Sequence, residues 1–274
     1  MAYPIAQTVN GPIEYRLEGA GPVVMVLNGG HCSRATRLSH EKLAAAGFTV
    51  LTPSRPGYDA TPAAVGRTAQ AAADALAALL DTLAIPAVAV IGISAAGPTA
   101  LAFAQQHPDK ATKVILESAV TTAWDPTLKR HARRLFGRTE RLTWSLLKLA
   151  LRLMPTTITK LMMQEFTVLN VEEVLQRMSQ EDIRFVQQMI RTMQSGTGFI
   201  SDIEHRVEQL QTIQAPLLVL YSPYDKSVPA HNAQRVAAEV AHCELYEVPA
   251  DSHLIWIGPA AAQVWQKRLA FLQG

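Results

Sequence analysis

The stretch that most constrains the fold is residues 87–107, where a short apolar run changes abruptly into an alanine-rich segment. The run 87–93 is rich in valine, isoleucine and alanine and predicts a buried strand. Ser94 is flanked by the small residues Gly92, Ala95, Ala96 and Gly97. Small side chains allow a sharp bend between two closely packed elements. Pro98 suits a first helical turn, where a backbone N–H is dispensable. The stretch therefore predicts a strand, a tight turn carrying Ser94, and a helix.

A serine at the tip of such a turn is well placed for chemistry. The turn holds it out of the strand, beside the unpaired amides at the start of the next helix, so its hydroxyl can reach a bound molecule. The segment from Gly92 to Gly97 resembles the nucleophile elbow of the α/β-hydrolases. The family pattern usually ends in glycine, and here Ala96 takes that place while Gly97 follows one residue later. The resemblance covers nearly the whole chain and is weakest in residues 121–212.

Strand and helix patterns alternate on both sides of this stretch, which favours a mainly parallel sheet with helices on both faces. An Asn10-Gly11 turn predicts an antiparallel hairpin at the start. We expect an α/β fold with the α/β-hydrolase sheet. The predicted strands are 5–9, 13–17, 23–27, 48–51, 87–93, 113–117, 216–221 and 244–248, and the predicted helices are 35–46, 68–83, the segment after Ser94, 230–240 and 259–272.

The alternation fails between about residues 121 and 212. This segment has apolar residues at helical spacing, several Gly, Pro and Ser breaks and no convincing strand, so it predicts four or five inserted helices. We expect a core of residues 1–120 and 213–274 and a helical cap of residues 121–212. In the family, an insertion at this place resembles a lid that covers the site and helps to select substrates. Candidate lining residues are Met162, Met163, Phe166, Met178, Phe185, Met189 and Met193.

Charge in the inserted segment is uneven, with basic residues in its first half and acidic residues in its second. The simplest account is a solvated face. The alternative is that the basic amphipathic part contacts anionic membrane surfaces or steers anionic substrates.

A serine nucleophile needs a base, and a histidine is the side chain best matched to that task. His253 follows the last predicted strand, in a loop that should end at the same sheet edge as Ser94. Asp225 follows the preceding strand and could orient the imidazole. The chain order Ser94, Asp225, His253 is that of the α/β-hydrolases. Glu117 and Asp251 are the competing acids, and we rank Asp225 ahead of both.

The resemblance also implies an oxyanion hole. It implies one donor at the amide of Ala95 and a second at Gly30, in a loop where Asn28 replaces the usual histidine. His31 and Tyr58 lie in loops that end at the same edge, and both are candidate substrate contacts. The sequence alone leaves open whether they are plain loop residues.

The whole-chain composition narrows the class of partner. The chain has 274 residues, a net charge of +2 and two distant cysteines, which argues against a nucleic-acid footprint and against a cysteine metal site. Residues 1–10 lack a signal-peptide pattern, and the apolar segment 142–154 is short and carries two charges. We expect a cytoplasmic protein with a small-molecule substrate, no cofactor, no metal and no stable membrane insertion, either monomeric or homodimeric.

Together these features predict an enzyme that hydrolyses a carboxylic ester or related acyl bond of a small to medium, largely apolar substrate through an acyl-enzyme. Hydrolysis of a carbon–carbon, lactone or amide bond and perhydrolysis use the same triad, so they remain alternatives. A non-catalytic ligand-binding protein on the same scaffold is the alternative from another class.

Overall fold

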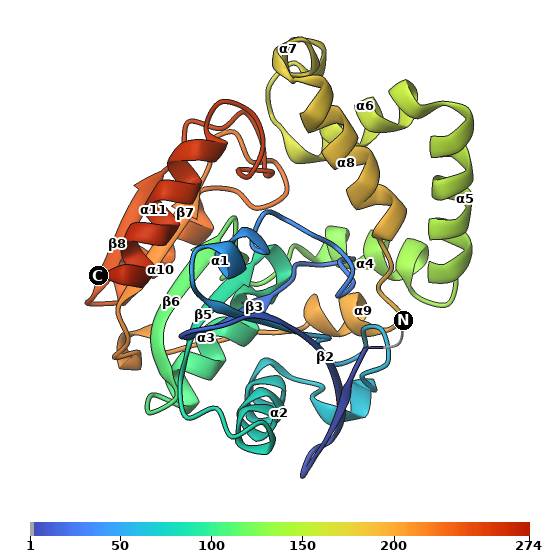
Figure 1. Ribbon diagram of the computed structural model, residues 1–274. Helices are drawn as coiled ribbons and strands as arrows, with labels where there is room; N and C mark the ends of the chain where they lie inside the picture. Colours follow the sequence, from blue (N-terminus) through green and yellow to red (C-terminus); the bar gives the residue numbers. More distant parts are fainter. Residues whose placement is uncertain (1–2) are drawn as a thin grey trace.

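Eight strands form one sheet in the computed structural model, which describes residues 3–274 (Figure 1). Their order is β1-β2-β4-β3-β5-β6-β7-β8. The β1–β2 and β2–β4 pairs are antiparallel and all other pairs are parallel, so the predicted fold class is confirmed. The strands are β1 (Ile5–Thr8), β2 (Gly11–Gly19), β3 (Val23–Leu27), β4 (Thr49–Pro53), β5 (Val88–Ile93), β6 (Ala111–Glu117), β7 (Leu217–Tyr221) and β8 (Cys243–Glu247).

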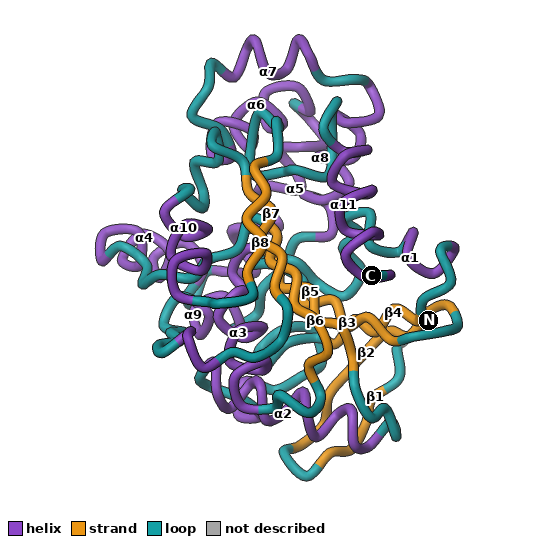
Figure 2. Tube along the Cα trace, turned by 90° about the vertical axis from the view of Figure 1, so that its left-hand side faces the viewer, coloured by secondary structure: helices purple, strands orange, loops and turns teal. Residues whose placement is uncertain are grey.

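Helices cover both faces of the sheet (Figure 2). The helices α2 (Ala69–Thr82), α3 (Gly97–Gln106) and α10 (His231–Glu239) share one buried cluster, whereas α1 (Lys42–Ala45) and α11 (Ala261–Gln273) belong to the other. Successive residues of β5 enter opposite clusters: Val88 and Val90 lie on one side, Ala89 and Ile91 on the other. Every residue of β5 is buried, as expected for a parallel strand covered on both faces.

The helix predicted at residues 35–46 is much shorter than expected, because α1 occupies only Lys42–Ala45. The side-chain amide of Asn28 donates to the carbonyl oxygens of Ser33 and Thr36, at 3.1 and 3.5 Å. In a helix, such carbonyl oxygens would accept from backbone amides of the following turn. Ser39 adopts a φ of 73°, which interrupts a right-handed helix. A side chain just after the end of β3 thus overrides the helical pattern of the following residues.

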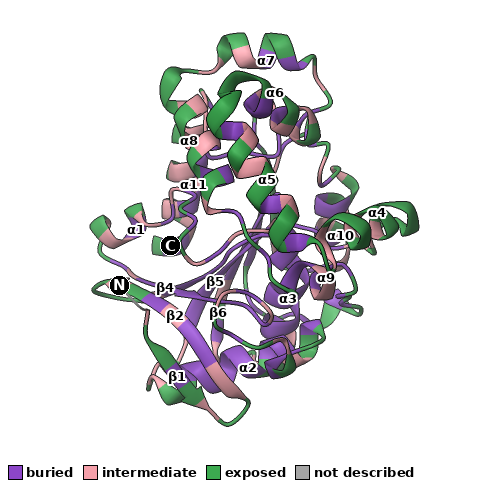
Figure 3. Ribbon diagram, turned by 90° about the vertical axis from the view of Figure 1, so that its right-hand side faces the viewer, coloured by how far each residue is buried: buried purple, intermediate pink, exposed green. Residues whose placement is uncertain are grey.

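Between β6 and β7 lie six α-helices and one short 3₁₀ turn, rather than the four or five helices predicted. In Figure 3 the helices α5 to α8 stand above the sheet. The elements are α4 (Pro126–Phe136), α5 (Glu140–Leu153), α6 (Pro155–Phe166), α7 (Val171–Arg177), α8 (Gln180–Thr192), α9 (Gly198–Asp202) and the 3₁₀ turn Leu210–Thr212. We call α4 to α8 the inserted helices.

The chain after α8 packs partly on the sheet layer and partly against the inserted helix α4, where the rings of Phe199 and Phe136 are in contact. Val207, Leu210 and Ile213 lie in the same buried cluster as α2 and α3. The amide of Gly198 donates to the carbonyl of Gly57 at 3.1 Å. Within residues 3–274, no helix combines the length and the apolar character needed to cross a lipid bilayer.

Candidate active site

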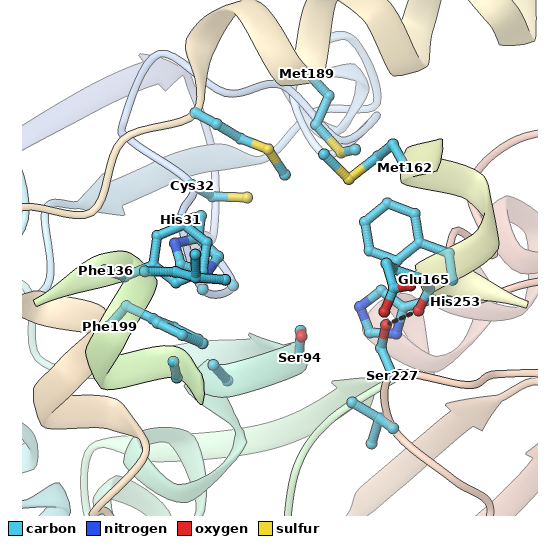
Figure 4. A pocket seen from close by; sticks show the side chains of 18 of the residues that line it. His31, Cys32, Ser94, Phe136, Met162, Glu165, Met189, Phe199, Ser227 and His253 are labelled. Atoms are coloured by element: carbon cyan, nitrogen blue, oxygen red, sulfur yellow. Dashed lines mark hydrogen bonds between the residues drawn. The ribbon is translucent and has the colours of Figure 1, made fainter. Parts of the chain in front are cut away.

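Ser94 lies at the sharp bend between β5 and α3. Its φ is +50°, in the left-handed region that non-glycine residues rarely adopt. The bend is tightly packed, since a Cβ added to Gly97 would lie 2.1 Å from the carbonyl oxygen of Val120. Ala95 and Ala96 are also fully buried. The small residues around the serine therefore meet a steric requirement, and the strained turn exposes the Ser94 hydroxyl at the floor of a cavity (Figure 4).

His253 and Asp225 meet at the ends of neighbouring strands. The Nδ1 of His253 and the Oδ2 of Asp225 are 2.6 Å apart, and both side chains are buried. The other carboxylate oxygen of Asp225 accepts the amide of Val228 at 2.8 Å, which fixes the orientation of the carboxylate. This arrangement leaves the Nε2 edge of the imidazole as the free side of the ring.

The two competing acids are engaged elsewhere. Glu117 is buried against Arg268, His40 and Trp256. Burial opposes ionisation there, but Arg268 and His40 prevail and hold the pKa of Glu117 below its usual value. The carboxylate of Asp251 accepts the Nε of Arg177 at 3.0 Å, at the surface.

Ser94 and His253 border the same cavity and approach it from different sides (Figure 4). No hydrogen bond joins their side chains within the described residues. The structure thus brings Asp225 and His253 into contact and places Ser94 in the same cavity as the imidazole.

The loop after β3 lies directly against the elbow. A Cβ added to Gly30 would lie 3.3 Å from the Cβ of Ala95 and 2.8 Å from the ring of Phe199, so only glycine allows this approach. The amides of Gly30 and Ala95 donate to no acceptor among residues 3–274. Asn28 binds the local backbone, as described above, and Arg55 donates to its carbonyl at 2.8 Å. The loop thus keeps a fixed shape without the histidine usual in the family.

His31 lines the cavity, and its left-handed φ of 61° turns it into an aromatic cluster. Its ring centroid lies 3.8 Å from that of Phe199 and 4.2 Å from that of Phe136. Burial lowers the pKa of His31 to about 3, so the ring is neutral at physiological pH. Its Nδ1 is 3.1 Å from the Oγ of Ser195, and Ser195 in turn binds Glu140 of α5.

Tyr58 lies outside the cavity, so the structure does not place it in contact with a substrate. It is buried, and its hydroxyl donates to Asp202 at 2.5 Å. Arg55 pairs with the other oxygen of the same carboxylate, also at 2.5 Å. Burial and the nearby Asp202 raise the pKa of Tyr58 well above its usual value. Tyr58 was a candidate substrate contact from the sequence, but the buried carboxylate of Asp202, far along the chain in α9, binds Tyr58 and Arg55 instead.

The cavity has a volume of about 920 Å³ and mostly apolar walls. Of the seven side chains proposed from the sequence, Met162, Phe166, Met189 and Met193 line it, and Met163, Met178 and Phe185 do not. The tryptophans Trp124, Trp144 and Trp256 also line it. Sequence reasoning missed them, because each is a single aromatic residue in a different element and no spacing connects them.

Metal-binding side chains are scattered in this fold. Among residues 3–274, no group of three or more His, Cys, Asp and Glu side chains is arranged to hold a metal ion.

Comparison with known proteins places the chain in a family. Residues 22–258 match the family described as alpha/beta hydrolase fold. An uncharacterized hydrolase of Bacillus subtilis, YcgS, is 30% identical over 271 residues, which cover 96% of this chain and 95% of that relative. An alpha/beta hydrolase fold protein from Nakamurella multipartita superimposes with a TM-score of 0.84 at 24% identity, covering 98% of each chain.

A thermophilic esterase from Thermogutta terrifontis is also similar in fold. It has a TM-score of 0.73 at 21% identity and covers 98% of this chain and 99% of its own. Since the family match extends over most of the sequence, the chain belongs to the alpha/beta hydrolase fold family and is a hydrolase of that superfamily.

Proposed function

We propose that the protein is a serine hydrolase that cleaves a carboxylic ester, or a related acyl bond, of a small to medium and largely apolar substrate. The observation that carries the proposal is the buried 2.6 Å contact between His253 and Asp225, on a cavity whose floor exposes the strained Ser94. A serine, a histidine and a carboxylate in this chain order provide the groups that acyl transfer needs.

In this mechanism the Oγ of Ser94 attacks the substrate carbonyl while the Nε2 of His253 accepts its proton. Asp225 holds the imidazole in the correct tautomer and stabilises the imidazolium that forms. The amides of Gly30 and Ala95 donate to the developing oxyanion, and each such donor accelerates the reaction by about 100- to 1,000-fold. The histidine returns the proton to the leaving alcohol. Water then attacks the acyl-Ser94 ester, with His253 again acting as the base.

The walls of the cavity favour an apolar acyl group. Leucine, alanine, aromatic and methionine side chains form most of the lining, and methionines adapt to ligands of different shape. The inserted helices contribute many of these walls, so we propose that they act as a lid that excludes water and selects substrates. A charged acyl group would lose much of its hydration on such a mostly apolar surface.

The first test is labelling of the purified protein with a fluorophosphonate probe. Wild type should be labelled, Ser94→Ala should not, and Ser145→Ala should label like wild type because Ser145 is an exposed serine of α5. Absence of labelling in folded wild type would contradict the enzyme and favour a ligand-binding protein.

The second test identifies the bond. Initial rates are measured on p-nitrophenyl esters of increasing acyl length, and on lactones, amides and a vinylogous 1,5-diketone. We expect the highest kcat/KM on neutral esters of short to medium length, and a fall of at least about a thousand-fold for Ser94→Ala. Turnover of the diketone or the amides in preference to all esters would overturn the assignment to esters but keep the triad.

A further inference from the structure

One helix of the inserted segment, α5, carries an exposed apolar stripe. The side chains of Leu142, Leu146, Leu149 and Leu153 recur at helical spacing and are 58%, 56%, 50% and 71% exposed. Contiguous apolar surface of this kind is rare on a soluble protein and marks a contact surface. The buried face of the same helix, with Trp144 and Leu151, already supplies its packing.

The stripe borders the opening of the cavity. Leu146 belongs to the stripe and also lines the cavity, and the next residues around the helix, Leu147 and Ala150, line it too. From α4, the cavity-lining Leu128 and Leu135 are 54% and 53% exposed. The apolar wall of the cavity therefore continues onto the outer surface of α4 and α5, interrupted there by His131 and Thr143.

Cations flank this surface. Residues 125–154 contain eight Lys and Arg but only two Asp and Glu, of which Glu140 is buried. On α5, Arg141, Lys148 and Arg152 follow one another on the side of the stripe opposite the cavity. Within residues 3–274, no carboxylate pairs with Arg130, Arg134, Arg138, Arg141 or Arg152.

We propose that the face formed by the leucine stripe of α5, the exposed leucines of α4 and the neighbouring Arg141 and Arg152 of α5 docks on an anionic lipid surface. The leucines would enter the boundary between headgroups and acyl chains, and the arginines would meet the anionic headgroups, as in an interfacial amphipathic helix. A second copy of the chain is a poorer occupant, because a two-fold contact would bring the same arginines face to face. Docked in this way, the cavity opens toward the lipid, and apolar molecules can enter without crossing water.

The test is co-sedimentation of the full chain with vesicles of phosphatidylcholine alone or mixed equally with phosphatidylglycerol. Binding to lipid does not require turnover, so the same assay on Ser94→Ala separates this proposal from the proposed reaction. We expect binding to the mixed vesicles, little binding to the neutral ones, and weaker binding as salt increases.

Two sets of variants locate the surface. Arg138→Gln/Arg141→Gln/Arg152→Gln should weaken binding on the order of 100-fold. Leu142→Gln/Leu149→Gln/Leu153→Gln should weaken it at least about tenfold. None of these side chains lines the cavity, so the kcat/KM on a water-soluble ester should stay at the wild-type value and report an intact fold.

The matched control is Leu17→Gln/Arg184→Gln/Arg191→Gln, which changes exposed residues on β2 and α8 and should bind like wild type. Equal binding to both vesicle types, no binding to either, or full binding by the two surface variants would overturn the proposal. A dimer in analytical ultracentrifugation that the leucine variants dissociate would also overturn it, in favour of self-association.

Discussion

The amide of His253 donates a 2.8 Å hydrogen bond to the carbonyl oxygen of Phe166, and the phenyl ring of Phe166 stacks on the imidazole at a centroid distance of 5.5 Å. Phe166 is the last residue of α6, so an inserted helix holds the loop of the proposed base. The next residue, Thr167, pairs with Asp225 through an isolated β-bridge. The inserted helices are thus attached directly to both residues of the His253–Asp225 pair.

Replacing Phe166 by alanine keeps the backbone hydrogen bond and removes the stacking. We expect kcat on an ester to fall on the order of 10- to 100-fold, because a small displacement of a catalytic group carries that cost. Phe185→Ala is the matched control, since Phe185 lies in an inserted helix outside the cavity. A rise in KM with unchanged kcat would mean that Phe166 is only a wall of the cavity.

Asp225 and the competing acid Asp251 should differ sharply in their effect on kcat. Asp225→Asn should lower kcat by about 10⁴-fold, because an amide cannot hold the required tautomer of His253. Asp251→Asn removes only a surface contact with Arg177 and should leave kcat near the wild-type value. Steady-state kinetics compare kcat of the two variants, and circular dichroism verifies that both are folded. An equal loss of kcat in both variants would contradict the assignment of Asp225.

Tyr58→Phe tests the placement of Tyr58 outside the cavity. The variant leaves one buried oxygen of Asp202 without its hydroxyl partner, so the free energy of unfolding should fall by about 1–3 kcal/mol. KM and kcat should stay unchanged. Urea unfolding and ester kinetics measure the two quantities, and a raised KM with unaltered stability would return Tyr58 to the substrate site.

His31 should make stability depend on pH. Its pKa is about 3 in the folded protein, against an ordinary value of 6.5, so between these values the unfolded chain binds a proton that the folded protein does not. The free energy of unfolding therefore falls as the pH decreases through this window, by up to about 1.4 kcal/mol per pH unit.

His31→Asn should flatten that dependence, since asparagine tolerates the left-handed backbone and does not titrate. Urea unfolding between about pH 6.5 and pH 4 measures the slope. His242→Asn changes an exposed histidine and should keep the wild-type slope. An unchanged slope in His31→Asn would show that other groups carry the acid sensitivity.

The sequence by itself determined the parts of this protein that depend on local pattern. The β5–Ser94–α3 unit could be predicted because a buried strand, a crowded turn and a helix each require particular residue types next to one another. Chain order placed Asp225 and His253 after successive strands, and parallel strands end at the same edge, so their 2.6 Å contact was foreseeable.

Only the tertiary structure decided the contacts between residues far apart along the chain. Asp202 draws Tyr58 and Arg55 away from the cavity, and Phe166 of α6 binds the backbone of His253. It also decided that the leucines of α5 face outward, since an exposed and a buried stripe have the same helical period. The physical reason is that a buried charge, an unsatisfied donor or an apolar face acquires its partner only when the chain has folded, and local sequence does not encode which distant residue that partner is.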